Sequence, residues 1–553
     1  MGSGDSFQRA TMLARLSSET FDVLVIGGGI TGVGVALDAA SRGLRTALVE
    51  RADFASGTSS KSSKLIHGGL RYLQQGEVRL VYEALHERQR LRRNAPHLVN
   101  VLPFMIPILT KDGVVSRKIA RALGSAMWMY DLTGGWRIGR FHRRLKADAA
   151  FAHLPTMPRE RLASAYLYYD ATADDARLCL TVARTAAAHG AIVANRCAVT
   201  AITKDAAGRA DGAIVEADGA SVTVRAHVVV NAAGVWADDV RAMDEGTHPD
   251  SIRPAKGVHI TVPWGKVRND IAVVIPVPKD KRSLFVVPWG AKEDGTFEHT
   301  YVGTTDTDYS GPLDDPQCTK DDIDYVLRAL NASVTTGVTA DDITGVWAGL
   351  RPLVKTAPSA RTADLSRRHS VRRSAGGVIT VAGGKLTTYR EMAEDTVDEA
   401  AEELGRKVRC RTKNLPLLGG EGYSPAAVGS PAAHLGGRFG TLADEVRALV
   451  SADPTLGEPL VPGLAYLRAE AVYAVRAEMA LTLDDVLTRR TRARLLDRDA
   501  TLAAAPAVAD LLGSELGWDR TERDAQLADF TARCREEELA AATVGVELLG
   551  TQQ

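Results

Sequence analysis

The sequence predicts an α/β protein with more than one domain and a helical C-terminal part. Its 553 residues exceed the size at which one hydrophobic core keeps growing, so several domains are expected. Residues 23–50 run from an apolar strand through a glycine-rich turn and a helix into a second apolar strand, the pattern of a parallel α/β unit. From about residue 401 the chain becomes rich in Ala, Leu, Glu and Arg, which favours helices after a Gly/Pro-rich joint at 415–425.

Composition excludes several classes of protein. The 68 Lys and Arg residues balance 68 Asp and Glu residues, so overall charge predicts no nucleic-acid partner. The five cysteines lack C-x-x-C pairs and histidines at zinc spacing, which predicts reduced thiols of a cytosolic chain and no metal site. Residues 1–20 lack the pattern of a signal peptide and are expected to be flexible. No apolar run is long enough to cross a bilayer, so any membrane contact is expected to be peripheral.

The first chemical motif lies in the glycine-rich turn after the strand at 23–26. The glycines match G-x-G-x-x-G between a strand and a helix, and the next strand ends in a glutamate at the distance expected of an acid that binds a ribose hydroxyl. Small residues let the backbone approach a pyrophosphate, and the helix N-terminus stabilises its charge. The pattern predicts a Rossmann-like dinucleotide site; the alternative is a turn that binds nothing. The predicted contacts are Gly27, Gly29, Ile30, Thr31, Gly32 and Glu50.

The loop at 56–73, SGTSSKSSKLIHGGLRYL, bears on which dinucleotide is bound. Its composition is typical of a solvated loop. However, it follows the nucleotide motif at once and carries hydroxyls and backbone N–H groups suited to a second region of a cofactor, whereas NAD-binding halves continue to a third strand. The loop therefore favours FAD. Its predicted cofactor contacts are Thr58, Ser59, Ser63, Lys64, Leu65 and His67.

The same loop carries a family resemblance. TSSKSSKLIHGGLRYL resembles the segment that follows the dinucleotide motif in FAD-dependent glycerol-3-phosphate dehydrogenases. Residues 473–497 resemble the C-terminal region that distinguishes this family from smaller amine-oxidising relatives, so the resemblance spans about 21–497. Five more motifs follow in the family's order: NAAGVWAD (231–238), KGVHITVP (256–263), VGTTDTDY (302–309), GLRPL (349–353) and GGKLTTYR (383–390).

The resemblance implies a fold, a cofactor and a reaction. A FAD-binding domain of the glutathione-reductase/amino-acid-oxidase type would carry an α+β substrate domain and a helical C-terminal domain. The family binds FAD non-covalently and oxidises sn-glycerol 3-phosphate to dihydroxyacetone phosphate. Its members pass the electrons to a membrane quinone or, in an oxidase branch, to oxygen. The implied division is 21–75, 175–245 and 345–400 for the FAD domain, 76–174 and 246–344 for the substrate domain, and 401–553 for the C-terminal domain.

The stretch GGKLTTYR looks at first like a phosphate-binding loop. A Walker A motif needs a glycine five positions before its second glycine and Ser or Thr directly after the lysine, but this chain has Ile379 and Leu386 there. We expect instead a strand-to-helix turn whose N–H groups suit an anion, and the resemblance implies that this turn approaches the flavin ring. Reduced flavin carries negative charge at its pyrimidine edge. The predicted cofactor contacts are Gly384, Lys385, Leu386 and Thr387.

The phosphate expected near this second turn is that of the substrate. A phosphate ester carries about −1.5 to −2 charges, which a partly desolvated site must balance with cations, preferably forked guanidiniums. Arg71, Arg351 and Lys385 lie in three separate motifs that the resemblance brings to one cavity. A solvated surface charge is the ordinary role of an arginine, but the Gly-Leu-Arg contexts favour ligand contact. Arg367 is a fourth candidate, and Tyr72 could hydrogen-bond the substrate or simply pack.

The reaction implied by the resemblance moves a hydride from C2 of the substrate to flavin N5 while the C2 hydroxyl loses a proton. His259 in KGVHITVP and His67 in KLIHGG are the candidate bases, because imidazole titrates near neutral pH. A lone histidine is more often structural, and the alternative for His67 is packing against the flavin. With Arg351 and Lys385 they complete the predicted catalytic set. Asp306 in GTTDTD is expected to cap a turn.

Two further strands complete the predicted nucleotide domain. Residues 190–205 alternate as one strand through Val199, whose backbone is expected to meet the adenine. Residues 222–238 place an apolar strand before small residues. Ala233 and Gly234 permit close approach to the cofactor, and Trp236 follows.

Residues 111–146 contain nine Lys or Arg residues against two Asp residues. Ile119, Leu123, Met127 and Tyr130 share one helical face, with Trp128 nearby. One interpretation is a substrate-domain helix followed by a basic loop, and the other is a surface that meets anionic headgroups and brings the flavin near quinone. The second places the protein in the cytoplasm, peripheral on the inner face of the cell membrane. The sequence leaves open whether the protein is a monomer or a homodimer.

Four functions compete at this stage. The leading interpretation is a sn-glycerol-3-phosphate:quinone oxidoreductase, and its nearest rival is a soluble oxidase that releases hydrogen peroxide. The basic segment favours quinone over oxygen. An amine- or amino-acid-oxidising enzyme is disfavoured by the phosphate-binding cations and the long C-terminal region. A flavin-binding regulatory protein without turnover is the remaining alternative.

Overall fold

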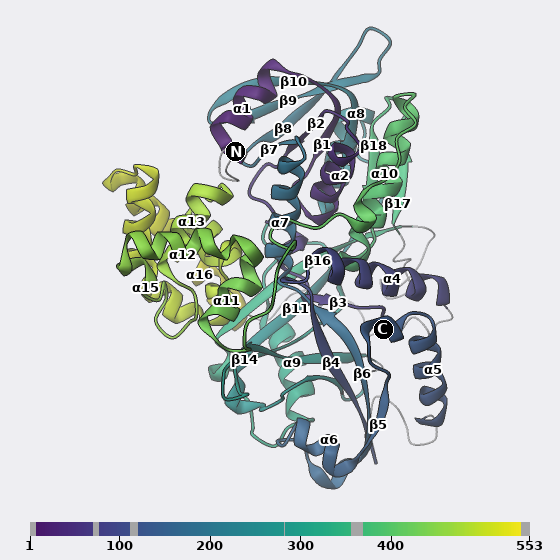
Figure 1. The fold of residues 1–553 in the computed structure, drawn as a ribbon, viewed down its shortest axis with the longest axis vertical. Helices are drawn as coiled ribbons and strands as arrows, with labels where there is room; N and C mark the ends of the chain where they lie inside the picture. Colours follow the sequence, from purple (N-terminus) through teal and green to yellow (C-terminus); the bar gives the residue numbers. More distant parts are fainter. Residues whose placement is uncertain (1–6, 70–76, 111–119, 281, 356–368, 544–553) are drawn as a thin grey trace.

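The computed structural model describes residues 7–69, 77–110, 120–280, 282–355 and 369–543. These residues form two β-sheets, one above the other in Figure 1, with a group of C-terminal helices packed on one side. The predicted α/β class is confirmed. Three predicted site residues, Arg71, Tyr72 and Arg367, and Ile119 of the predicted helical face lie outside the described residues.

The first sheet has a parallel centre built from segments far apart in the chain. Its parallel strands pair mainly through short apolar runs that are buried, as expected for parallel strands covered on both faces. The parallel order is β18 (Ile379–Ala382), β10 (Ala220–Asn231), β1 (Thr20–Ile26), β2 (Thr46–Val49) and β7 (Ile192–Ala194). Antiparallel strands extend it: β17 (Ser370–Arg373), β8 (Ala198–Lys204) and β9 (Ala210–Ala217).

The predicted strand at 190–205 is two strands. The chain leaves β7 after Ala194 and turns through Arg196, which has a positive φ of 54°, before β8 begins at Ala198. The alternating pattern of side chains continues across this break, which is why the sequence suggests a single strand.

Three helices cover the first sheet near its glycine turns. Helix α2 (Ile30–Ser41) packs between α10 (Tyr389–Glu403) and α7 (Asp175–Ala188). Gly34 allows α2 to approach α10 closely, because a Cβ at this position would lie 2.7 Å from Cδ2 of Tyr389. The helix that follows the first glycine turn is thus joined to the helix that follows the second.

The N-terminal segment differs from the flexible start that the sequence predicts. Residues Arg9–Ser18 form helix α1, which contacts β7 and β10. Met12 and Leu16 are one helical turn apart and buried, so a short apolar stripe is enough to fix this helix on the sheet.

The second sheet receives strands from both predicted domains. Its path is β15 (Thr307–Asp308), β11 (Ile252–Pro263), β14 (Phe297–Gly303), β13 (Ser283–Ala291), β12 (Ala272–Pro276), β4 (Asn100–Leu109), β6 (Leu162–Thr172) and β3 (Leu65–Ile66), with β16 (Gly345–Val354) on β11 and β5 (Arg143–Lys146) on β6. Strands β3 and β16 come from segments that the sequence division assigns to the FAD domain. They carry the motifs KLIHGG and GLRPL from one sheet to the other.

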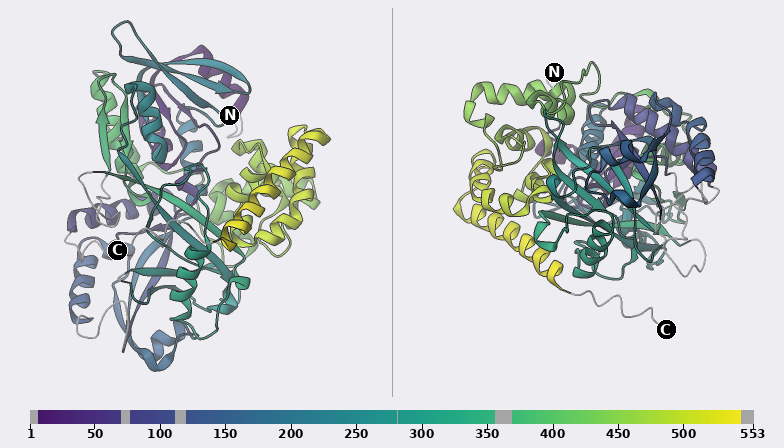
Figure 2. Two further views of the ribbon diagram at one scale, coloured as in Figure 1. Left: turned by 180° about the vertical axis from the view of Figure 1, so that it is seen from behind. Right: turned by 90° about the horizontal axis from the view of Figure 1, so that it is seen from below.

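Helices of three segments surround the second sheet and complete the fold. The helices packed around this sheet are α4 (Val78–Asn94), α5 (Ala120–Leu132), α6 (Ala147–His153) and α9 (Lys320–Asn331). Helix α8 (Ala237–Glu245) follows β10 and packs on the first sheet. The predicted helical C-terminal region is confirmed, and Figure 2 shows it as a separate group beside both sheets. It comprises α11 (Pro431–Phe439), α12 (Ala443–Ala452), α13 (Arg468–Glu478), α14 (Ala493–Leu496), α15 (Arg498–Leu516) and α16 (Arg520–Ala542).

Candidate functional site

The first glycine turn leaves strand β1 with little room for side chains. Gly27 has φ of +113°, and a Cβ there would lie 2.7 Å from the carbonyl oxygen of Ala232. A Cβ on Gly32 would lie 1.9 Å from the carbonyl oxygen of Gly27. Only glycine fits these two positions, so the turn can bring its backbone close to a ligand.

Glu50 holds this turn as well as facing the cavity. Its Oε2 accepts a hydrogen bond from the Gly28 N–H at 2.6 Å, and its Oε1 accepts one from the Ala52 N–H at 2.8 Å. Burial raises the pKa of Glu50, which those two N–H groups partly oppose. Each oxygen keeps a further lone pair, so the predicted contact with a ribose hydroxyl is compatible with this geometry.

The second glycine turn has the strand-to-helix form that the sequence predicts. After β18, Gly383 and Gly384 have φ of +78° and +79°, and a 3₁₀ turn at Leu386–Thr388 leads directly into α10. A Cβ on Gly384 would lie 2.3 Å from Sδ of Met392. Lys385 occupies the position that begins the helical turn.

Both turns line one cavity of about 230 Å³. Gly29 and Gly384, some 350 residues apart, share its wall, which is the arrangement that the sequence interpretation requires. Gly32 is buried in α2 and does not reach this wall. The predicted contacts that line the cavity are Gly27, Gly29, Ile30, Thr31, Glu50, Thr58, Ser59, Val199, Ala233, Gly234, Trp236, Gly384, Lys385 and Leu386.

The serine-rich loop joins the first turn to strand β16. Ser59 Oγ accepts a hydrogen bond from the Ile30 N–H at 2.9 Å, at the start of α2. Thr58 Oγ1 donates to the carbonyl oxygen of Leu350 at 2.6 Å. Residues 56–59 of the loop are therefore part of the cavity wall and not the solvated segment that their composition alone suggests.

The next three predicted cofactor contacts point elsewhere. Ser63 Oγ lies 2.8 Å from Nε2 of His259. Lys64 is buried and forms an ion pair with Asp175 at 3.2 Å, while burial lowers its pKa to about 8 despite that carboxylate. Leu65 is buried in β3. None of the three lines the cavity, because the chain turns here from the first sheet into the second.

His67 and Thr387 connect the two halves of the site. The His67 N–H donates to Thr387 Oγ1 at 3.2 Å, so the KLIHGG segment touches the second glycine turn. The half-buried His67 ring meets Phe285 edge-to-face at 6.2 Å between centroids. Neither His67 nor Thr387 lines the 230 Å³ cavity.

Arg351 lies beside this cavity, one residue before Pro352 on its wall. Its Nη1 donates to Asp306 Oδ1 at 3.1 Å, and its Nη2 donates to Thr304 Oγ1 at 3.2 Å. The carboxylate of Asp306, which was expected to cap a turn, forms an ion pair with Arg351. Sequence spacing could not show this pairing, because it depends on β16 and β14 lying on either side of β11.

Comparisons with known proteins agree with this arrangement. A family model described as FAD dependent oxidoreductase matches residues 22–390, and one described as the C-terminal domain of alpha-glycerophosphate oxidase matches 410–523. Glycerol-3-phosphate dehydrogenase 2 of Mycobacterium tuberculosis is 42% identical, covering 97% of this chain and 92% of that protein. The mitochondrial glycerol-3-phosphate dehydrogenase of Homo sapiens is 38% identical over 94% of this chain and 74% of its own. This chain belongs to the FAD-dependent glycerol-3-phosphate dehydrogenase family.

A solved structure extends the family likeness to the whole fold. The glycerol-3-phosphate dehydrogenase from Bacillus halodurans, complexed with FAD, superposes with a TM-score of 0.74 at 30% identity and covers 98% of this chain and 99% of its own. FAD is thus the cofactor of this family member, as predicted. The cavity fits it, since glycines open the wall at both turns and the helix start after Gly29 suits the pyrophosphate.

His259 is buried and does not line the cavity. Its ring is buried and stacks on Trp347 with centroids 4.7 Å apart. Burial lowers the pKa of His259 well below its usual range, and the positive charges of Lys64 and Arg351 lower it further. The imidazole is therefore neutral at physiological pH, with Nε2 directed at Ser63 Oγ.

The sequence interpretation missed part of the cavity wall. Arg51 stacks over Trp236, with its guanidinium carbon 4.5 Å from the ring centroid, and both line the cavity. Asp239 and Met243 of α8 also line it. Asp239 follows Trp236 by three residues and Met243 follows Asp239 by four, a helical spacing that could have been used. Pro352 and Met392 also line the cavity, but they come to it through tertiary packing, which no sequence pattern shows.

Proposed function

We propose that this protein oxidises sn-glycerol 3-phosphate to dihydroxyacetone phosphate. The observation that carries the proposal is the convergence of Lys385 and the first glycine turn on one cavity with Arg351 at its side. FAD, when bound, supplies the hydride acceptor at its N5. The relatives that are more than a third identical over almost the whole chain are named for the same substrate.

The phosphate would be held by Arg351 and Lys385, together with Arg71 and Arg367. Asp306, Thr304 and the carbonyl oxygens of Lys256 and Thr305 fix the plane of the Arg351 guanidinium, whose permanent positive charge suits a phosphate. Lys385 adds a charge at the helix start, where backbone N–H groups also favour an anion. Tyr72 is the proposed hydrogen-bond donor beside Arg71.

His259 is the proposed base for the C2 hydroxyl. Burial keeps the His259 ring neutral, and in the tautomer that carries its proton on Nδ1 the Nε2 atom would accept from the Ser63 hydroxyl at 2.8 Å, which would pass on the proton from the site. His67 is the alternative base, and its backbone bond to Thr387 holds it beside the second glycine turn.

We propose a membrane quinone as the electron acceptor, reached from a lipid surface. Within the described residues, no helix is both long enough and apolar enough to span a bilayer. The predicted apolar face of 119–130 is internal where it is described, because Leu123, Met127 and Tyr130 pack in the core. The opposite side of α5 instead exposes Trp128, Leu132 and the nearby Phe141, at 54%, 71% and 56%.

A bilayer is the occupant that this exposed patch fits. Trp128 and Phe141 lie with ring centroids 6.2 Å apart, and Tyr82 and Val78 of α4 are also exposed. Aromatic and aliphatic side chains beside the basic residues of 137–146 match an interface of acyl chains and anionic headgroups. The proposed location is therefore the inner face of the cell membrane.

The test is to add sn-glycerol 3-phosphate without oxygen to purified holoprotein and record the flavin spectrum. Bleaching by this compound and not by glycerol is expected, and an unchanged spectrum would reject the proposed substrate. A quinone analogue should then restore the oxidised spectrum faster than air does. Equally fast recovery in air, with hydrogen peroxide released, would instead establish the oxidase alternative.

A further inference from the structure

Three arginines of the C-terminal region are buried against the FAD-binding part of the chain. Arg489, Arg490 and Arg492 have side-chain exposures of 9%, 2% and 0%. They come from a π-helical segment at Asp485–Arg490 and the residues directly after it. We call these three residues the arginine clamp. Arginine is rarely this buried unless its charge is compensated, so their partners define what the clamp does.

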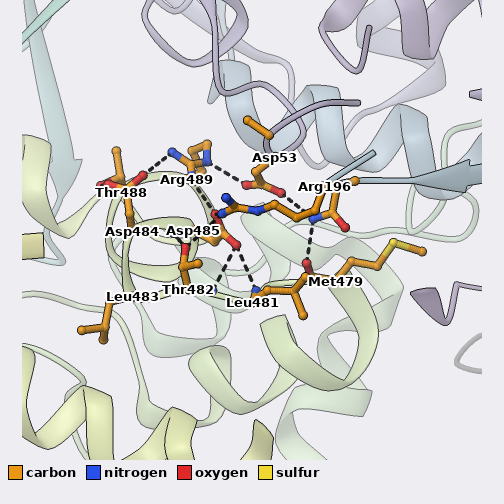
Figure 3. A network of polar contacts seen from close by, with 12 residues as sticks. Asp53, Arg196, Met479, Leu481, Thr482, Leu483, Asp484, Asp485, Thr488 and Arg489 are labelled. Atoms are coloured by element: carbon orange, nitrogen blue, oxygen red, sulfur yellow. Dashed lines mark hydrogen bonds and ion pairs between the residues drawn. The ribbon is translucent and has the colours of Figure 1, made fainter. Parts of the chain in front are cut away.

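Asp53 is the partner of the first two arginines. Its Oδ2 accepts from Arg489 Nε and from Arg490 Nη1, both at 2.7 Å, and its Oδ1 accepts from Arg490 Nη2 at 2.9 Å. Asn195 donates to the same carboxylate at 3.1 Å and to the carbonyl oxygen of Met479 at 2.9 Å. Figure 3 shows Asp53 facing Arg489, with Asp484 and Asp485 on the other side of that guanidinium.

The charge on Asp53 is stabilised by these contacts. Burial alone would raise the pKa of Asp53, but the guanidiniums of Arg490 and Arg489 hold it below its usual range. Asp53 therefore stays ionised at physiological pH, and the segment directly after Glu50 is bound by charge to the C-terminal region.

Arg492 holds the other end of the same loop. It forms ion pairs with Asp174 and Asp175, and its Nη2 donates to the carbonyl oxygen of Ser60 at 3.2 Å. Asp175 Oδ2 in turn accepts from the N–H and the hydroxyl of Ser62, at 2.9 and 2.7 Å. Lys64 pairs with the same carboxylate.

The residues between these anchors, 53–62, form what we call the cofactor loop. Its inner side carries Ser56, Gly57, Thr58 and Ser59, which line the FAD cavity. Arg489 and Arg492 line a different cavity, of about 380 Å³, which has only Arg51, Ser56 and Trp236 in common with the first. The clamp thus lies behind the loop and would act on FAD only through it.

We propose that the arginine clamp positions the cofactor loop and thereby controls how firmly FAD is held. Arg489, Arg490 and Arg492 are positioning residues, since they contact Asp53, Asp175 and Ser60 and not the cavity. The clamp keeps Ser59 Oγ within reach of the Ile30 N–H at the start of α2, where the pyrophosphate is expected. This role assigns the C-terminal helices to the cofactor site, and it depends on FAD occupying the cavity but not on the identity of the substrate.

The experiment measures FAD dissociation from the holoenzyme of an Arg492→Met variant. Released FAD regains fluorescence, so its rate of appearance after dilution gives the dissociation rate without any turnover. The matched control is Arg184→Met. Arg184 is also buried, with 5% of its side chain exposed, and it pairs with Glu478 and the Tyr473 hydroxyl of the C-terminal helices but not with the cofactor loop.

Each variant is measured at the same interval below its own melting temperature, which removes the effect of general destabilisation. We expect Arg492→Met to release FAD about tenfold faster than the wild type. Arg492→Lys should recover part of the retention, and Arg184→Met should release FAD at close to the wild-type rate. Equal release from the Arg492 and Arg184 variants would overturn the proposal.

A second variant keeps the test decisive if Arg492→Met does not fold. Ser62→Ala removes one hydroxyl bond to Asp175 and leaves the buried charges in place. A dissociation rate above that of the wild type, with an altered visible circular dichroism of the bound flavin, is the expected result. An unchanged rate and an unchanged flavin spectrum would count against the proposal.

Discussion

Nη1 of Arg351 lies 3.1 Å from Oδ1 of Asp306, and Arg351 directly precedes Pro352, which lines the FAD cavity. Arg351 is on strand β16, whereas Asp306 follows strand β14. Both Nη atoms also donate to backbone carbonyl oxygens, Nη1 to Lys256 at 3.5 Å and Nη2 to Thr305 at 3.1 Å, so an anion would meet a positive charge whose orientation the protein has already fixed. The contact therefore connects a predicted phosphate ligand to the carboxylate that orients it.

Replacing Arg351 by Met should raise the KM for sn-glycerol 3-phosphate by about 10- to 100-fold, because a charge-assisted hydrogen bond contributes about 1.5–3 kcal/mol. Arg351→Lys should restore little, since an ammonium lacks the planar fork. Steady-state kinetics with a quinone analogue measure the change.

Arg253→Met is the matched control. Arg253 is on the neighbouring strand, pairs with Asp308 and is 25% exposed, against 24% for Arg351. An unaltered KM in Arg351→Met would remove this residue from the phosphate site.

His259→Gln should lower kcat by about 100-fold or more if the imidazole takes the C2 proton. Ser63→Ala should lower kcat less and leave KM nearly unchanged, because it interrupts the path to Nε2 without removing the base. Because the pKa of His259 is depressed, the acid limb of the wild-type kcat/KM profile should lie below pH 6.5.

His299→Gln is the control, as His299 is another buried histidine of the same sheet with a lowered pKa. Loss of melting temperature alone, with kcat intact, would assign His259 a packing role.

The glycine turns could be predicted from the sequence because each belongs to a short strand–turn–helix pattern, although the atom that Gly27 faces belongs to the distant Ala232. Gly27 and Gly32 face backbone atoms at distances that exclude any Cβ, and the two strands on either side appear in the sequence as apolar runs. The same holds for Gly384, where the failed Walker pattern left a strand-to-helix turn as the alternative. These features depend on a few neighbouring residues, which is what a sequence pattern records best.

The charged contacts could not be predicted in the same way. Asp53 and Arg489 are 436 residues apart, and in the sequence the TRRTRAR segment is indistinguishable from a solvated basic stretch. Lys64, predicted as a cofactor contact, is directed to Asp175 because a buried ammonium needs a carboxylate partner. The amphipathic pattern at 119–130 identified a helical face, but only packing shows that its described members, Leu123, Met127 and Tyr130, are internal.

Lys64 should make stability depend on pH between about pH 8 and 10.5. Burial lowers the pKa of Lys64 to about 8, from 10.5 for an exposed lysine, so the folded state releases this proton first. In that window the unfolded state binds more protons, and the free energy of unfolding therefore rises with pH, by about 3 kcal/mol in total from this residue.

Denaturant unfolding of wild type and Lys64→Met at pH 7.5 and 9.5 isolates this contribution from other titrating groups. The variant should lack the rise that Lys64 adds in the wild type. Lys413→Met removes a lysine whose side chain is half exposed and should behave like the wild type. Identical pH dependence in wild type and Lys64→Met would show that Lys64 keeps its ordinary pKa.

Removing the exposed aromatic patch should weaken membrane binding while leaving soluble turnover intact. The triple variant Trp128→Ser, Leu132→Ser and Phe141→Ser deletes the apolar side chains that would enter the bilayer, and burying each is worth about 1.5–3 kcal/mol. Pelleting with vesicles of mixed zwitterionic and anionic phospholipid should fall by about tenfold or more.

Val428→Ser with Leu539→Ser is the control, because these side chains are equally exposed, at 71% and 67%, on other elements. Reduction of the flavin by sn-glycerol 3-phosphate should be the same in all three proteins, since none of these residues lines the FAD cavity. If the triple variant pellets like the wild type, the bilayer contacts another face and the quinone must reach the flavin from elsewhere.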